Sequence, residues 1–342
     1  MATIKDIAKK SGYSIGTVSR VINNRSDVSQ EARTRIENTI KELDFRPNEN
    51  AKLLKQAVPS GISVIVRGMD NRFLTSILEK IQARLAEHGE GVGVRFLHET
   101  EDEVLTAAEL ARRYKLKGFI FLGGSSLSFR KSFDQVKLPS VLVTASASAL
   151  GFDNLSSFTT DDYAAAGFAV EQLIAKGHKH IGIIGGLPID HDDDNTARRI
   201  AGAIDAMKRA GIEADAGHNW IPCLFSMEAG YEAAGKLLEQ YPEVTAVFAL
   251  SDMVAYGVIR AFFDRGFNVP DDFSVISIDG VESTNYSIPR LSTVKQDVDQ
   301  LAEKSVDDLL LRISYGRNAT HATVPFSFVV GESIAPPRDK DN

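Results

Sequence analysis

The chain has 342 residues, of which 43% are hydrophobic and 25% charged, and its formal net charge is −7; this is typical of a soluble globular protein with two or three domains. Its one cysteine, Cys223, excludes a disulfide framework or a thiolate metal site within the chain, and no apolar run reaches the roughly 18 residues of a membrane-spanning helix. The start, MATIKDIAKK, lacks the apolar segment of a secretory signal, so a cytoplasmic location is expected.

Residues 1–46 are predicted to form three short helices. Gly12 permits a tight turn after the first helix, Ser14 can cap the second, and Pro47 ends the unit. The apolar positions expected on the inward faces of the second and third helices are Val18, Val21, Ile22, Ile36, Ile40 and Leu43. Their spacing of three and four residues is typical of amphipathic helices.

Two helices joined by a tight turn, the second with one polar face, indicate a helix-turn-helix that reads DNA. The charge distribution agrees, because residues 1–60 hold 11 Lys and Arg against 7 Asp and Glu, whereas the whole chain holds 39 against 46. Arg20 suits a bidentate contact with guanine, and Ile15 suits a thymine methyl group. The alternative is a solvated helical face with no partner. The exposed candidates are Ile15, Gly16, Thr17, Ser19, Arg20 and Asn23.

From residue 61 onward, short apolar runs alternate with amphipathic stretches. Strands are expected at GISVIVRG, VGVRFL, GFIFLGG, SVLVTA, HIGIIGG, VTAVFALSD and FSVISIDG, and helices near 72–88, 101–115, 163–176, 195–210 and 253–265. This alternation predicts parallel sheets that are covered by helices on both faces. The polar stretch 144–162 divides the pattern into two similar halves, so we expect two doubly wound α/β subdomains with a cleft between them.

Ligands of such sheets bind beyond the carboxyl ends of the strands. Asp252 and Asp279 both follow predicted strands. Asp252 is expected to cap the helix that begins at Met253. Asp279 is the better candidate for binding, because a lone carboxylate after an apolar strand is unfavourable without a partner.

Residues 3–55 resemble the DNA-binding head of the lac repressor family, whose signature runs through T-V-S-R-V-I-N to L-x-[YF]-x-P-N. The resemblance implies that Ile15, Gly16 and Arg20 read bases and that Thr17, Ser19 and Asn23 contact the DNA backbone. The segment PNENAKLLK resembles the family's hinge helix, which inserts a leucine into the minor groove. The matching residues are Leu54, with Lys52 and Lys55 beside the phosphates; many members have Arg where this chain has Lys52. The alternative for this segment is a simple linker.

Residues 61–335 resemble the sugar-binding-protein-like core of the same family, through pieces such as LIAKGHKHIGIIGG, RRIAG, AVFALSD and LSTVKQD. The resemblance implies an effector site made of Phe73, Asp161, Arg199, Phe225, Ser251, Asp279 and Gln296. For Phe73 and Phe225 the alternative is core packing.

The resulting prediction is an α/β protein with an N-terminal helix-turn-helix head and two doubly wound parallel-sheet subdomains of the periplasmic-binding-protein-like type. The predicted domains are the head at 1–46, a hinge helix and linker at 47–60, an N-terminal subdomain at 61–160 and 293–320, and a C-terminal subdomain at 161–292 and 321–338.

No catalytic, metal or cofactor site is expected. The loop IDHDDDN at 189–195 is read as an exposed acidic loop, since consecutive residues rarely converge on one ion. The spacings G-x-G-x-x-G, G-x-x-x-x-G-K-[ST] and G-x-S-x-G are absent where nucleotide binding or nucleophilic catalysis would need them.

Together with the family resemblance, these patterns predict a ligand-responsive transcription regulator, in particular a repressor. The resemblance implies that it binds a near-palindromic operator as a homodimer and senses a small metabolite, in particular a sugar. A corepressor protein stays open as a further partner. The alternatives are a sugar-binding protein or a sugar-modifying enzyme built on the same core.

Overall fold

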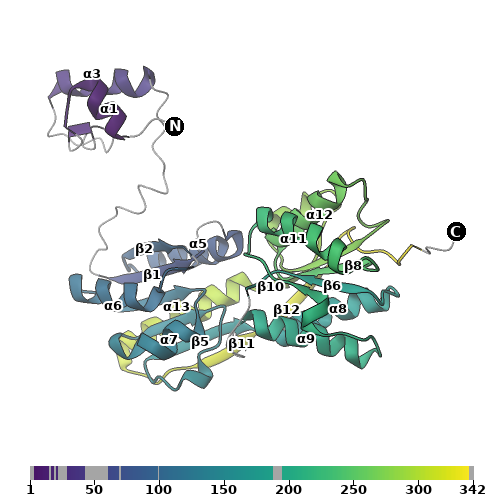
Figure 1. The fold of residues 1–342 in the computed structure, drawn as a ribbon. Coiled ribbons are helices and arrows are strands. Elements are labelled where there is room, and N and C mark those ends of the chain that lie inside the picture. The colour runs from purple at the N-terminus through teal and green to yellow at the C-terminus, as the bar shows by residue number, and fades with distance from the viewer. Residues whose placement is uncertain are drawn as a thin grey trace. The chain divides into compact units, whose positions relative to one another are not determined.

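The structure is a computed structural model that describes residues 4–14, 17–18, 21, 29–42, 61–68, 71–98, 100–187 and 195–338. The chain separates into two compact units, residues 1–57 and residues 58–342. Both units are drawn in Figure 1.

The first unit contains α1 (Ile4–Ser11) and α3 (Gln30–Glu42), and residues 17, 18 and 21 between them are helical. The side-chain oxygen of Ser14 accepts a hydrogen bond from the backbone N–H of Thr17 at 3.1 Å, which confirms the predicted cap. Gly12 follows α1 with φ +79°, as the predicted turn requires. Ile7, Ala8, Val18, Val21 and Ile36 form the small core. The predicted packing of the second and third helices is therefore confirmed at Val18, Val21 and Ile36, and at Ile40, which is partly buried against this core. Ile22 and Leu43 lie outside the described residues.

The second unit has two lobes, each built on one six-stranded sheet. The first-lobe sheet has the order β11-β5-β4-β3-β1-β2, with all neighbours parallel. Its strands are β1 (Ile62–Arg67), β2 (Val92–Leu97), β3 (Gly118–Leu122), β4 (Ser140–Val143), β5 (Leu155–Thr160) and β11 (His321–Val324). Its helices are α5 (Arg72–Glu87), α6 (Glu103–Arg113), α7 (Ser126–Ser132), η1 (Phe133–Gln135), η2 (Ser148–Leu150) and α13 (Val298–Tyr315).

Both faces of the first-lobe sheet are covered. Ile62, Val64 and Val66 on β1 pack with α5 and α13, whereas Ile65 packs with α6 and α7 on the opposite face. The alternation follows from the strand period of two. The apolar strands of this sheet are therefore packed against helices on both faces, as the sequence predicts.

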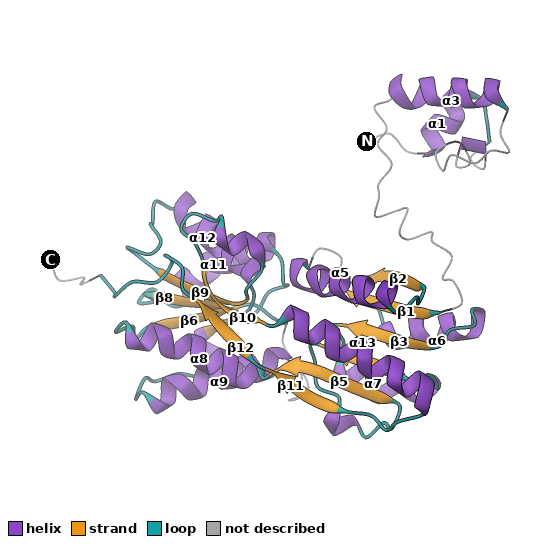
Figure 2. Cartoon of the chain, turned by 180° about the vertical axis from the view of Figure 1, so that it is seen from behind, coloured by secondary structure: helices purple, strands orange, loops and turns teal. Residues whose placement is uncertain are grey.

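The second-lobe sheet has the order β12-β10-β9-β8-β6-β7 and is parallel except for the pair β10–β12. Its strands are β6 (Ile181–Ile184), β7 (Trp220–Ile221), β8 (Ala246–Ala249), β9 (Ser274–Asp279), β10 (Ser292–Gln296) and β12 (Phe326–Val329). Its helices are α8 (Asp162–Ala175), α9 (Asn195–Arg209), α10 (Ala216–Asn219), α11 (Met227–Gln240), α12 (Asp252–Asp264) and η3 (Glu282–Asn285). Helices α8 and α9 cover one face, and α11 and α12 cover the other (Figure 2). The predicted fold class is confirmed.

Two of the predicted domain boundaries are wrong. Residues 293–296, assigned to the N-terminal subdomain, lie in β10, which pairs with β9 of the second lobe. Residues 321–324, assigned to the C-terminal subdomain, lie in β11, which pairs with β5 of the first lobe. The chain therefore returns to the first lobe only at α13 and leaves it again at Pro325, between β11 and β12.

The polar stretch 144–162 contains β5, which the sequence pattern does not reveal because the strand reads LSSFTT. All six of its residues are buried, and hydrogen bonds of the Ser156 and Thr159 hydroxyls compensate for part of their polarity. Ser156 accepts from Arg312 at 3.1 Å, and Thr159 donates to the Thr144 carbonyl at 2.8 Å. Among the described helices, none is long and apolar enough to cross a membrane.

Candidate functional site

The described part of the first unit includes Thr17, one of the predicted DNA-contacting residues. Its hydroxyl lies 2.9 Å from the Ser14 hydroxyl, beside the cap of the second helix. The other predicted DNA contacts lie outside the described residues: Ile15, Gly16, Ser19, Arg20, Asn23, Lys52, Leu54 and Lys55.

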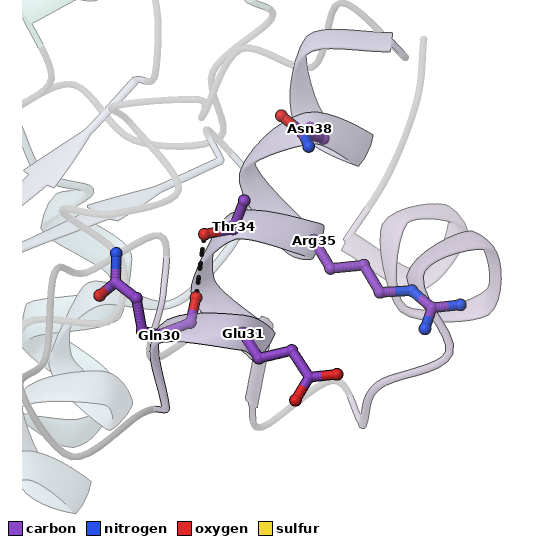
Figure 3. A pocket seen from close by; sticks show the side chains of 5 residues that line it. All are labelled: Gln30, Glu31, Thr34, Arg35 and Asn38. Carbon is purple, nitrogen blue, oxygen red and sulfur yellow. Dashed lines mark hydrogen bonds between the residues drawn. The ribbon is translucent and has the colours of Figure 1, made fainter.

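Helix α3 presents a polar outer face. A shallow surface pocket there is lined by Gln30, Glu31, Thr34, Arg35 and Asn38 (Figure 3). The Thr34 hydroxyl donates to the Gln30 carbonyl of its own helix at 3.0 Å. Among the residues that the structure describes, none of the predicted site residues lines this pocket, and its side chains form the solvated face opposite the buried Ile36.

In the second lobe, candidate residues gather at the carboxyl ends of parallel strands. β9 ends at Asp279 and β10 ends at Gln296, and both strands run in the same direction. Arg199, on the second turn of α9, reaches this edge from one face of the sheet. Parallel strands place their carboxyl ends together, which brings Asp279 and Gln296 side by side. Arg199 meets them from α9.

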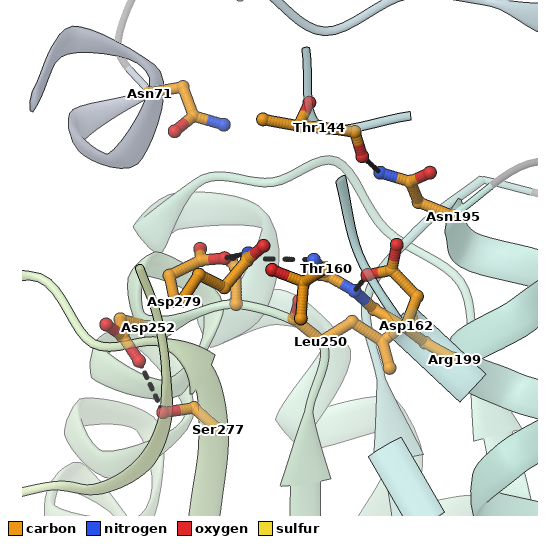
Figure 4. A network of polar contacts seen from close by, with 12 residues as sticks. Asn71, Thr144, Thr160, Asp162, Asn195, Arg199, Leu250, Asp252, Ser277 and Asp279 are labelled. Carbon is orange, nitrogen blue, oxygen red and sulfur yellow. Dashed lines mark hydrogen bonds and ion pairs between the residues drawn. The ribbon is translucent and has the colours of Figure 1, made fainter. Parts of the chain in front are cut away.

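Arg199 is the centre of a buried ionic network (Figure 4). Its Nε donates to Asp162 Oδ1 at 2.7 Å, its Nη1 donates to the Leu250 carbonyl, and its Nη2 lies 3.8 Å from Asp279 Oδ1. Burial alone would lower the pKa of Arg199, but the carboxylates of Asp162 and Asp279 raise it above its usual value. The guanidinium therefore remains charged and is held by groups of the protein itself.

Asp279 combines burial with backbone strain. Its Oδ1 accepts from Gln296 Nε2 at 2.9 Å, and its φ of +128° lies in a region that favours glycine. Burial raises the pKa of Asp279 to about 8; Arg199 opposes this shift, and the nearby Asp252 carboxylate adds to it. A strained carboxyl at a strand end is the kind of group that functional sites retain.

The sequence predicts that Asp252 caps a helix beginning at Met253, and this prediction is wrong. Helix α12 begins at Asp252 itself, and its cap is Ser251, whose hydroxyl accepts from the Val254 backbone N–H at 3.3 Å. The Asp252 carboxylate instead accepts from Ser277, Thr293 and Val281. Burial raises its pKa to about 6 despite these hydrogen bonds.

A pocket of about 970 Å³ opens between the first-lobe helix α5 and the strand ends of the second lobe. Three of the predicted effector residues line it: Phe73, Asp279 and Gln296. Phe73 is also buried in the first-lobe core, with 4% of its surface exposed. Phe225 is half-buried against both cores of the second lobe and does not line the pocket.

Asp161 and Asp162 have different contacts, and Asp161, the predicted effector residue, is not the one that meets Arg199. Asp161, the predicted residue, caps α8 through the Ala164 N–H and forms an exposed ion pair with Arg198 at 3.2 Å. Asp162 is the one that meets Arg199, and its side chain is 3% exposed. The sequence analysis does not predict a role for Asp162. The two consecutive aspartates could have indicated one, because only one of them can cap the helix and the other needs a different partner.

A hydrogen bond joins the lobes on the other side of this network. Asn195 Nδ2, on the first residue of α9, donates to the carbonyl oxygen of Thr144, which follows β4 (Figure 4). Thr144 has φ +78°, a strained conformation for a β-branched residue. Neither residue was predicted. Across the described residues, no group of three or more His, Cys, Asp or Glu side chains is arranged to hold a metal ion.

Comparisons with known proteins agree with both units. Residues 3–48 match the family described as bacterial regulatory proteins, lacI family, and residues 170–334 match the periplasmic binding protein-like domain. Among solved structures, a lac repressor dimer bound to operator and the anti-inducer ONPF has a TM-score of 0.68 at 25% identity, over 98% of this chain and 99% of that one. A transcriptional regulator CelR–cellobiose complex has a TM-score of 0.70 at 24% identity, over 97% and 100%, and shows the fold alone.

Curated relatives extend over almost the whole chain. The HTH-type transcriptional regulator MalR of Clostridium butyricum is 32% identical over 96% of this chain and 98% of its own length. The HTH-type transcriptional repressor PurR of Pasteurella multocida is 30% identical over 92% of each. The HTH-type transcriptional repressor CytR of Escherichia coli is 32% identical over 86% of this chain and 85% of its own. The chain therefore belongs to the lacI family and is a DNA-binding transcription regulator with an effector-binding core.

Proposed function

We propose that this regulator is a cytoplasmic repressor that binds its operator as a homodimer and responds to a sugar bound between the two lobes. The observation that carries the effector half is the convergence of Asp279 and Gln296 with Phe73 on one pocket. A carboxyl and an amide can bond to sugar hydroxyls, and an aromatic ring can cover the C–H face of a sugar ring.

We propose that the effector site consists of the seven residues predicted from the sequence, and that only some of them contact the sugar directly. Asp279, Gln296 and Phe73 make direct contacts, because they line the pocket. Arg199 has donors that face Asp162 and Leu250, and it orients Asp279 from beneath. Asp161, Phe225 and Ser251 complete the set as contacts that form when the lobes move on the bound sugar.

For DNA, we propose that Ile15, Gly16 and Arg20 read bases in the major groove, while Thr17, Ser19 and Asn23 contact the backbone. Leu54 enters the minor groove, with Lys52 and Lys55 beside the phosphates. Two heads on a dimer then read two half-sites of a near-palindromic operator. The relatives that are named transcriptional repressors support this assignment.

We propose no catalytic activity. The buried carboxyls at the strand ends are engaged with Arg199, Gln296, hydroxyls and a backbone N–H, which suits binding and not proton transfer to a substrate. The enzyme alternative predicts turnover of a sugar by the purified protein, which chromatography of the incubated sugar would detect.

A two-step experiment tests the proposed function. The purified protein is screened by thermal shift against a panel of sugars and nucleobases, and every hit is repeated in a DNA-binding titration. A sugar that raises the melting temperature and changes DNA affinity supports a sugar-gated repressor, and the direction of the change separates inducer from corepressor. If DNA binding is intact and no sugar binds, the proposed sugar is wrong and a partner protein becomes the leading signal.

A further inference from the structure

Asp252 ties together three segments at the edge of the effector pocket. Its carboxylate is fully buried. Oδ1 accepts from the Ser277 hydroxyl on β9 at 2.6 Å and from the Thr293 hydroxyl on β10 at 2.7 Å. Oδ2 accepts from the backbone N–H of Val281 at 2.7 Å, directly after β9. Charge-assisted hydrogen bonds of this length are the stronger kind.

The segment that Asp252 holds is the pocket wall, which we define as residues 279–285; all seven line the pocket. A second contact lies one helical turn along α12, where the Tyr256 hydroxyl donates to Ser283 Oγ at 2.9 Å. Residues four apart share a helix face. Helix α12 therefore fastens the wall at two points, Val281 and Ser283.

The charge of Asp252 also acts on the pocket. The charged groups that share this buried region are Asp162, Arg199, Asp252 and Asp279. Burial is the main reason that Asp279 resists ionisation, and the negative charge of Asp252 adds to it. The backbone strain at Asp279 persists only while its neighbours hold it.

We propose that Asp252 is a positioning residue of the effector site, which fixes the pocket wall and the strained Asp279 through its hydrogen bonds and acts on the Asp279 carboxyl through its charge. Asp252 does not line the pocket, so this role is exerted through other residues. The role in effector binding rests on the proposed function, because it requires Asp279 to contact the sugar.

Three variants separate the components of this role. Asp252→Asn removes the charge but keeps the shape, because its amide oxygen can face Val281 while its NH₂ faces the two hydroxyls, which can accept. Asp252→Ala removes both charge and hydrogen bonds. Tyr256→Phe removes only the second fastening point and serves as the matched control.

The decisive measurements need no bound sugar. The titration of Asp279 is followed by NMR of protein labelled at the aspartate side-chain carboxyl carbon, with the signal assigned by its loss in Asp279→Asn. Asp252→Asn should lower the titration midpoint by about one pH unit, whereas Tyr256→Phe should leave it unchanged. A merely structural role of Asp252 would not shift the midpoint. A midpoint that does not move in Asp252→Asn therefore overturns the proposed action of the charge.

Hydrogen exchange tests the fastening of the wall. In Asp252→Ala, a peptide covering the pocket wall should exchange about tenfold faster than in wild type, with a smaller effect in Tyr256→Phe. Unchanged exchange overturns the proposed fastening. If Asp252→Ala does not fold, the midpoint of Asp252→Asn decides.

Titration with cellobiose and with D-ribose separates this inference from the proposed function. A probe that binds wild type should bind Asp252→Ala at least about tenfold more weakly. Binding that is lost in Asp279→Asn but kept in Asp252→Ala contradicts the positioning role. Binding that is equal in wild type and Asp279→Asn contradicts the proposed site, and the NMR and exchange results still decide the role of Asp252.

Discussion

Arg199 and Asp162 form an ion pair between α9 and α8, with Nε and Oδ1 2.7 Å apart and with side chains that are 8% and 3% exposed. The same two helices carry a second pair, Arg209 Nη2 and Glu171 Oε1 at 2.9 Å, whose side chains are 55% and 51% exposed. Similar geometry thus occurs in two dielectric environments. The buried pair lies beneath the proposed effector site, and the exposed pair is screened by water.

Replacing Arg199 by alanine should destabilise the core strongly. Asp162 and Asp279 would be left buried without their cation, and breaking such a buried pair costs about 3–5 kcal/mol. Urea unfolding measures the change, with Arg209→Ala as the control on the same helix. Equal and small effects of the two substitutions would mean that the Arg199 network does not stabilise the fold.

The ionisation of Asp279 should make core stability fall as pH rises. Its pKa is about 8 in the folded protein against 3.8 ordinarily. Between these values the folded state holds a proton that the unfolded chain has released, so the free energy of unfolding decreases with pH in this interval and levels off above it. Asp279→Asn removes this dependence. It should gain stability relative to wild type by a few kcal/mol between pH 5 and pH 9. Urea unfolding of both proteins across this range measures it, and parallel pH profiles would show that Asp279 ionises normally.

Gly280 should not tolerate a side chain. It has φ +72°, and a Cβ there would overlap the Lys295 backbone and side chain on β10. Gly211 has nearly the same φ, +73°, but no atom within 4 Å of its added Cβ. Gly211→Ala should therefore show only the backbone penalty of about 1–2 kcal/mol. Gly280→Ala should add about 1–3 kcal/mol from overpacking and disturb Asp279. Equal losses of stability would mean that Lys295 moves aside freely.

The sequence predicts the lobes well because their central strands are continuously apolar. Strands such as GFIFL and AVFA are buried on both faces, and hydrophobicity alone identifies them. Hydrophobicity does not identify β5, because four of its six residues are Ser or Thr. Hydrogen bonds inside the protein allow hydroxyls such as those of Ser156 and Thr159 to be buried. β10 and β11 are assigned to the wrong lobes, because a short strand's sequence does not specify which sheet edge it joins.

The sequence analysis names residues that line the candidate pocket, but not the buried residues that hold them in place. Asp279 follows from its place at a strand end together with the family resemblance, whereas Gln296 follows from the resemblance alone. Asp162 and Asp252 have no pattern of their own that separates a buried partner from a helix cap. Their roles depend on partners 37 and 25 or more residues away, Arg199 for the first and Ser277 for the second. Only the fold brings these partners together.

Replacing Arg20 by alanine should weaken specific DNA binding by about 1–3 kcal/mol and relax the preference at one base pair. The reason is the loss of a bidentate contact with guanine, while phosphate contacts persist. Binding of a randomised DNA library, followed by sequencing of the bound fraction, measures the preference at each position. An unchanged sequence preference would remove Arg20 from the residues that read bases.

The central claim is that a sugar in the pocket lined by Asp279 controls the affinity for DNA. The most direct measurement is the dissociation constant for a DNA site selected by the protein, determined with and without each sugar that raises the melting temperature, in wild type and in Asp279→Asn. The account predicts that at least one sugar changes the wild-type constant by about 5–150-fold. In Asp279→Asn the sugar should have no effect, while sugar-free DNA binding stays intact. A DNA affinity that no sugar changes, or that changes equally in both proteins, would contradict the account.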